Sequence, residues 1–174
     1  ERHLLDGHHV PAVGVEADRR LDQLLDLLQL LRTPRHRLQL GRLARRRARG
    51  ASCPVLFVQD DVCTLSSIPP DKFDWVVACF LCCVLPYEFQ DQALAQISRV
   101  LKPGGRFCLL EMVYSKDPKL RRRQDLFAPF VEKVYGARFD RNTLEHAKNT
   151  PGLKVAATRF IKQDTYLLIE GMRE

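Results

Sequence analysis

The chain has 174 residues, of which 45% are hydrophobic, and carries a formal net charge of +7. This length suits one domain with a sizeable core, and no apolar run reaches the roughly 20 residues that cross a bilayer, so no transmembrane segment is predicted. Six cysteines lack the spacing of a secreted disulfide scaffold, which predicts an intracellular protein, cytoplasmic or mitochondrial.

The first fifty residues differ in composition from the remainder. They are rich in Leu and Arg and contain none of the chain's Phe, Tyr or Trp residues. A domain normally spreads such residues through its core, so we divide the chain into an atypical N-terminal part, 1–50, and an α/β core, 51–174. Two interpretations of the arginine cluster at 42–49 stay open. It is a solvated segment, or it contacts nucleic acid or another anionic surface.

The predicted elements begin inside the atypical part. Residues 10–16 are typical of a short strand that ends at an acidic residue, and 19–32 of a helix with leucines along one stripe. Residues 54–58 (Pro-Val-Leu-Phe-Val) predict the next strand, which runs directly into an acidic pair at 60–61.

The central stretch predicts a strand, a helix and a second strand. Residues 74–83 are almost uninterruptedly apolar, as in a strand covered on both faces. Apolar residues then recur at three- and four-residue steps up to 101, and a Lys-Pro-Gly-Gly turn at 102–105 is expected to end that helix. The second strand covers 106–113. Such a crossover joins parallel neighbours and is right-handed in nearly all proteins.

The remaining third of the chain adds helices and a hairpin. A helix is expected over 120–135, interrupted at Pro129, and a short one over 142–148. Strands at 154–160 and 165–170 form an antiparallel hairpin. The sequence therefore predicts an α/β, doubly wound, Rossmann-like and mostly parallel sheet with a C-terminal antiparallel hairpin.

Polar or small residues follow the predicted strands at three points. These are Glu16, the pair Asp60–Asp61, and Ala78–Cys79. Ligands of open α/β sheets bind beyond the carboxyl ends of strands. An acid there can accept hydrogen bonds from ribose hydroxyls, each worth roughly 1.5–3 kcal/mol. Each acid alone is more typical of a helix cap or a surface charge, but their order along the chain favours a nucleotide-like ligand.

Other residue groups have a simple structural interpretation beside a functional one. Cys79, Cys82 and Cys83 are more typical of small apolar fillers than of a metal site, so no metal is predicted. His146 is either a surface histidine or a general base. The basic run at 119–123 is a solvated helix face or, as the minority interpretation, a contact with head groups or phosphate.

Three motifs resemble the class I S-adenosylmethionine-dependent methyltransferases, particularly the type 11 small-molecule branch with the ubiquinone and menaquinone methyltransferases. They are 57–62 (Phe-Val-Gln-Asp-Asp-Val), 73–80 (Phe-Asp-Trp-Val-Val-Ala-Cys-Phe) and 99–106 (Arg-Val-Leu-Lys-Pro-Gly-Gly-Arg), the last leading to Glu111. The resemblance implies S-adenosylmethionine as cofactor. Glu16 would hold its ribose and Asp61 its adenine, with Val62 beside the ring. The methionine end would be lined by Ala78, Cys79 and Phe80.

One departure from the family concerns the start of the chain. The family opens with a strand and a Gly-rich loop about twenty residues before the ribose acid, whereas Glu16 lies too near the first residue. We therefore expect an N-terminally truncated methyltransferase domain without that loop. No catalytic residue is predicted, because a sulfonium methyl donor is already activated and needs mainly alignment and desolvation.

The expected activity is methyl transfer to a small-molecule or lipid-like acceptor. Ala78–Leu81 stands where nucleobase and amide N-methyltransferases carry an Asn/Asp-Pro-Pro-aromatic motif, which disfavours those substrates. Aromatic and aliphatic residues between 114 and 148 would form an apolar lid, or would simply pack on the sheet. The alternative is a catalytically inactive scaffold that binds RNA or a ribonucleoprotein through its arginines.

Overall fold

The computed structural model describes residues 55–161 and 163–174. Residues 59–174 belong to one compact unit, which contains every helix and strand given below, and 55–58 belong to a second unit. The predicted strand at 10–16, the predicted helix at 19–32 and the arginine cluster at 42–49 lie outside the described residues.

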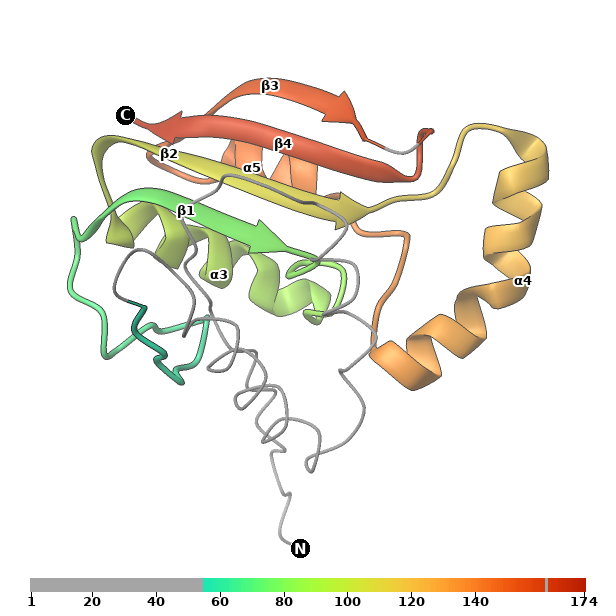
Figure 1. The fold of residues 1–174 in the computed structure, drawn as a ribbon, viewed down its shortest axis with the longest axis horizontal. Helices are drawn as coiled ribbons and strands as arrows, with labels where there is room; N and C mark the ends of the chain where they lie inside the picture. Colours follow the sequence, from blue (N-terminus) through green and yellow to red (C-terminus); the bar gives the residue numbers. More distant parts are fainter. Residues whose placement is uncertain (1–54, 162) are drawn as a thin grey trace, which may run out of the picture. The chain divides into compact units, whose positions relative to one another are not determined.

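A four-stranded sheet organises the described unit (Figure 1). Its spatial order is β1-β2-β4-β3, with β1 parallel to β2 and the other two pairings antiparallel. The predicted parallel crossover and the predicted C-terminal hairpin are both confirmed. The strands are β1 (Phe73–Cys79), β2 (Leu101–Met112), β3 (Leu153–Phe160) and β4 (Tyr166–Arg173).

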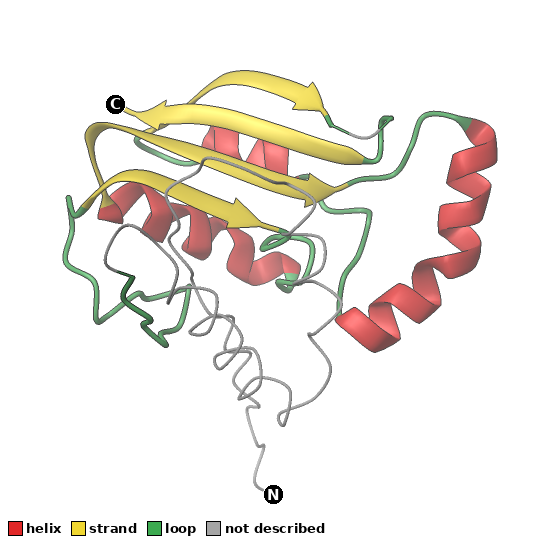
Figure 2. Ribbon diagram, in the orientation of Figure 1, coloured by secondary structure: helices red, strands yellow, loops and turns green. Residues whose placement is uncertain are grey.

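Three helices accompany the sheet. Figure 2 shows α3 and α5 behind the strands, whereas α4 lies beyond the end of β2. They are α3 (Tyr87–Val100), α4 (Pro118–Tyr135) and α5 (Thr143–Asn149). Helix α4 begins after Asp117, whose side chain accepts the N–H groups of residues 119 and 120, and ends at Gly136 in the left-handed conformation. It continues through Pro129 without ending there.

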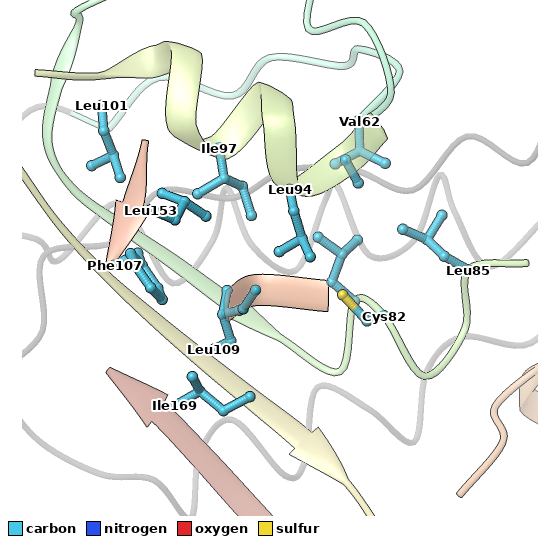
Figure 3. Close-up of a cluster of buried hydrophobic side chains, with 13 residues drawn as sticks. Val62, Cys82, Leu85, Leu94, Ile97, Leu101, Phe107, Leu109, Leu153 and Ile169 are labelled. Carbon is cyan, nitrogen blue, oxygen red and sulfur yellow. The ribbon is translucent and has the colours of Figure 1, made fainter. Parts of the chain in front are cut away.

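The core lies between the sheet and α3. Phe107 and Leu109 alternate with outward-facing residues along β2, and both are fully buried. They pack with Ile169 of β4 and with Leu94 and Ile97 of α3 (Figure 3). Each such side chain stabilises the fold by about 1.5–3 kcal/mol, and the predicted helical stripe of α3 is buried in this core.

The Lys-Pro-Gly-Gly segment starts β2 and does not cap α3. The helix ends at Val100, and Leu101 is already extended. Gly104 takes the left-handed conformation three residues later. Gly105 is required for a different reason: a Cβ there would lie 2.8 Å from the carbonyl oxygen of Lys102. The predictions of a glycine helix cap and of a turn at 102–105 are therefore wrong, because these residues already belong to β2.

The strand predicted at 54–58 is not present over residues 55–58, which have irregular structure. An apolar run favours burial, but Leu56 is 84% exposed, and a strand also requires a neighbour that takes up its backbone hydrogen bonds. Composition cannot supply that second condition.

Candidate functional site

The tip of β1 is a closed and buried corner. Phe80 follows the strand with φ of 56°, and its N–H donates to the carbonyl of Leu110 at 2.6 Å. Its ring is 4% exposed and meets the edge of Tyr166, with ring centres 5.6 Å apart. The chain then turns sharply at the carboxyl end of the parallel pair, where this fold class binds ligands.

A carboxylate from the next strand holds this corner in place. Glu111 faces the core from β2 and is 1% exposed. Its Oε1 accepts the N–H of Cys82 at 2.8 Å, and its Oε2 accepts the N–H of Cys83 at 2.9 Å. Burial raises the pKa of Glu111 to about 7, and the two N–H donors counteract part of that rise. Glu111 is thus an anchor for the loop after β1.

The two neighbouring acids Asp60 and Asp61 have different environments. Asp60 accepts the N–H and the hydroxyl of Ser67, and these bonds lower the pKa of Asp60 to about 2. The Asp60 carboxylate therefore stabilises the conformation of its own loop. Asp61 is half-buried, its Oδ1 accepts the N–H of Cys63 at 2.9 Å, and its carboxylate also interacts with the Cys63 thiol. These contacts cover the carboxylate only in part, so it can also meet a ligand.

Arg99 fastens the loop that carries these acids. It lies in the last turn of α3, and its guanidinium donates to the carbonyls of Leu65 and Ile68 at 2.9 Å each and of Thr64 at 3.4 Å. Three carbonyls of one loop therefore depend on a single side chain. The Arg of the Arg-Val-Leu-Lys-Pro-Gly-Gly motif is a structural clamp.

The predicted cofactor residues on this side of the sheet lie in one region. Figure 3 shows Val62 next to Leu85 and Cys82, and all three belong to the same core cluster. The loop after Asp61 and the corner after β1 are therefore neighbours. Ala78 and Cys79 are half-buried at the strand end, and burial raises the pKa of Cys79 to about 11.

Val62 and Glu16 differ from the other predicted cofactor residues. The Val62 side chain is 4% exposed and packs inward, so a contact with the adenine ring would have to come from its main chain. Glu16 lies outside the described residues.

The cysteines of the corner are packing residues. Cys82 and Cys83 have no exposed surface, and burial raises the pKa of both thiols. Over residues 55–161 and 163–174, no group of three His, Cys, Asp or Glu side chains is arranged to hold a metal ion. His146 bonds through Nδ1 to Asp91 at 2.6 Å, which ties α5 to α3.

A pocket of about 240 Å³ adjoins the corner. It lies where β2 ends and β4 begins, and Tyr166, which packs on Phe80, forms part of its wall. Sequence reasoning missed it because its wall comes from four separated segments. Its lining residues are Met112, Gln124, Phe139, Thr165 and Tyr166.

Comparisons with known proteins agree with this geometry. Residues 39–105 match the "Methyltransferase domain" family. A solved S-adenosylmethionine-dependent methyltransferase from Methanosarcina mazei superimposes with a TM-score of 0.58 over 87% of this chain and 86% of that chain, at 17% identity. At that identity the likeness establishes the fold.

Curated relatives share short segments of higher identity. The mitochondrial 2-methoxy-6-polyprenyl-1,4-benzoquinol methylase of Rattus norvegicus is 36% identical over 89 residues, which is 51% of this chain and 26% of the relative. The protein of the same name from Mus musculus is 50% identical over 46 residues, 26% of this chain and 14% of the relative. The chain thus spans about a quarter or less of the length of these relatives.

The family match over residues 39–105, the fold of the solved methyltransferase and the segments shared with the relatives together support a class I S-adenosylmethionine-dependent methyltransferase. This confirms the family that the three sequence motifs predict.

Proposed function

We propose that the protein transfers a methyl group from S-adenosylmethionine to a small-molecule or lipid-like acceptor. One observation supports this most directly: the corner after β1, anchored by Glu111, lies beside the loop that carries Asp61. A cleft for an adenosyl group requires these two neighbours at the carboxyl end of a parallel pair.

The residues present fit such a cofactor. The second Asp61 oxygen can accept a hydrogen bond from the adenine amine or a ribose hydroxyl, and charged bonds of this kind are worth about 1.5–3 kcal/mol. Ala78 and Cys79 are small, which lets a ligand approach the strand backbone. We assign Asp61, Ala78, Cys79 and the main chains of Val62 and Phe80 to the cofactor. Glu16 stays a proposal for the ribose.

The acceptor would enter the pocket lined by Met112 and Phe139. Its volume of about 240 Å³ lies below the about 300–1,000 Å³ typical of ligand pockets, so it suits one ring and not a whole chain. Gln124 and Thr165 add polar groups to an otherwise apolar wall. The names of the curated relatives support an aromatic quinol with a polyprenyl tail, and a mitochondrial location is part of the proposal.

The chemistry requires little from the side chains. When bound, S-adenosylmethionine would supply a methyl group that its sulfonium already activates. The acceptor atom would bond this methyl as the S–CH₃ bond breaks with its electron pair left on sulfur, and the acceptor's proton would pass to solvent. The corner after β1 holds the reacting atoms in line, and such positioning is worth about 7–11 kcal/mol. Phe80 and Tyr166 exclude water on one side. No general base is assigned.

The test is transfer of a labelled methyl group from S-adenosylmethionine into extractable lipid. A short-chain polyprenyl quinol should become labelled, and a tail-free quinol should react more slowly. Phe139→Ala in the pocket should raise the KM for the quinol and leave cofactor affinity unchanged, whereas Phe160→Ala on β3 should change neither. Absence of labelled product with every quinol, despite cofactor binding, would contradict the proposed acceptor.

A further inference from the structure

Helix α4 presents large apolar side chains to its surroundings. None of its 18 residues is buried. Leu126 is 76% exposed, Phe127 58% and Phe130 54%. Single exposed apolar residues are ordinary, but three on two turns of one helix indicate a contact surface. Figure 1 shows α4 apart from α3 and α5.

Four basic residues share this side of the helix. Residues three, four or seven apart lie on one face of an α-helix, and the basic residues occur at such steps from the three apolar ones. None of the four forms an ion pair with a described residue, so their charges are uncompensated there. They are Lys119, Arg122, Arg123 and Lys133. We call these seven residues the apolar-basic face of α4.

The acids of α4 are placed elsewhere on its circumference. Asp125 pairs with Arg121 at 3.2 Å, and Glu132 pairs with Arg138 at 3.0 Å. The two acids are seven residues apart, so they share a stripe of their own. Their charges are already neutralised by partners on that side. The apolar-basic face therefore combines exposed Phe and Leu with positive charge alone.

We propose that this face docks α4 onto the surface of an anionic phospholipid bilayer. An interfacial helix buries Leu and Phe at the acyl boundary while Lys and Arg reach the head groups along their aliphatic stems. No helix in the described part of the chain is long and apolar enough to cross a membrane, so α4 would lie in the plane of the interface.

The charge pattern favours lipid over the other possible occupants. A second copy of the chain would bring an identical positive face against the first, and like charges at an interface cost several kcal/mol. Single-stranded nucleic acid would satisfy the charges and could stack on Phe127 and Phe130, but the most exposed apolar residue of the face is the aliphatic Leu126, which bases do not cover and an acyl boundary does. The proposal goes beyond methyl transfer and does not depend on it.

The test is co-sedimentation of the 174-residue chain with vesicles of phosphatidylcholine, with and without phosphatidylserine. Binding should require phosphatidylserine and weaken as salt is added. Each basic residue near an anionic surface is worth about fivefold in affinity, so Arg122→Gln with Arg123→Gln should weaken binding about 25-fold. Phe127→Ser with Phe130→Ser should weaken it about tenfold or more.

The matched control removes two positive charges from β3. Lys154→Gln with Arg159→Gln should bind vesicles like the unchanged chain. All variants lie on exposed positions, and equal urea unfolding midpoints would show that they are folded. Three results would overturn the proposal: no vesicle binding, equal loss in the control, or self-association or RNA binding that depends on the same residues while vesicles are ignored.

Discussion

The carboxylate of Glu111 and the backbone N–H of Cys82 are 2.8 Å apart, although 29 residues separate them in the chain. Because the second oxygen takes the adjacent N–H of Cys83, the loop after β1 has its shape set from β2. The candidate cleft therefore depends on a buried acid that touches no part of the proposed ligand.

Protonation of Glu111 should make stability depend on pH. Its pKa is about 7 in the fold and 4.5 without burial, so the folded chain binds the proton more tightly. The free energy of unfolding should therefore fall by about 3 kcal/mol as pH rises from about 4.5 through 7. Urea unfolding across this range measures the fall.

Glu111→Gln isolates that contribution, because the amide does not titrate. The difference in unfolding free energy between the variant and the unchanged chain should shift by about 3 kcal/mol across the same pH range. Glu88→Gln, on the exposed first turn of α3, should show no such shift. If the Glu111 variant keeps the pH dependence of the unchanged chain, the buried carboxylate is not its source.

Loss of the Arg99 clamp should loosen the Asp61 loop. Arg99→Met removes a charged donor from the carbonyls of Leu65 and Ile68, and we expect a loss of at least about 2 kcal/mol in unfolding free energy. Lys102→Met removes only an exposed pair with Asp74, so its cost should be at most about 1 kcal/mol. Equal losses would refute the clamp.

Gly171 should be irreplaceable for reasons of space. A Cβ at this β4 position would lie 2.2 Å from the carbonyl oxygen of Lys154 and 2.5 Å from the ring of Phe107. Gly171→Ala should destabilise the chain by about 3 kcal/mol. Gly136→Ala meets no atom within 4 Å and should cost about 1 kcal/mol for its left-handed backbone. Thermal unfolding of both variants measures which substitution costs more stability. A larger loss for Gly136→Ala than for Gly171→Ala would contradict the close packing around Gly171.

Sequence reasoning predicted the elements whose signals are local. The stripe along α3 records burial directly. The apolar run at 74–83 marks the place of β1, but the expected cover on both faces is wrong, because no β1 residue is fully buried and Trp75 is 48% exposed. Residues 55–58 carry the same apolar signal without forming a strand, because pairing depends on distant residues.

The candidate site was only partly predictable. Asp61 and the tip of β1 follow from the rule that ligands bind at strand ends. The anchoring role of Glu111 does not follow from that rule, although one signal for it exists. Glu111 continues the series of inward-facing residues Phe107 and Leu109 on β2, and an acid that is buried in this way needs hydrogen-bond donors around it. The role of Arg99 has no such signal, because an Arg in a last helical turn is typical of a solvated residue.

Calorimetric titration with S-adenosylmethionine tests the central claim, that the Asp61 loop and the tip of β1 form the cofactor cleft. The unchanged chain should give a saturable binding heat. Asp61→Asn keeps an acceptor for the Cys63 N–H but removes the carboxylate charge, and should weaken binding about tenfold or more at unchanged stability. Asp74→Asn, an exposed acid paired with Lys102, should bind normally. Absence of binding heat in the unchanged chain, or equal affinity in the Asp61 variant, would contradict the account.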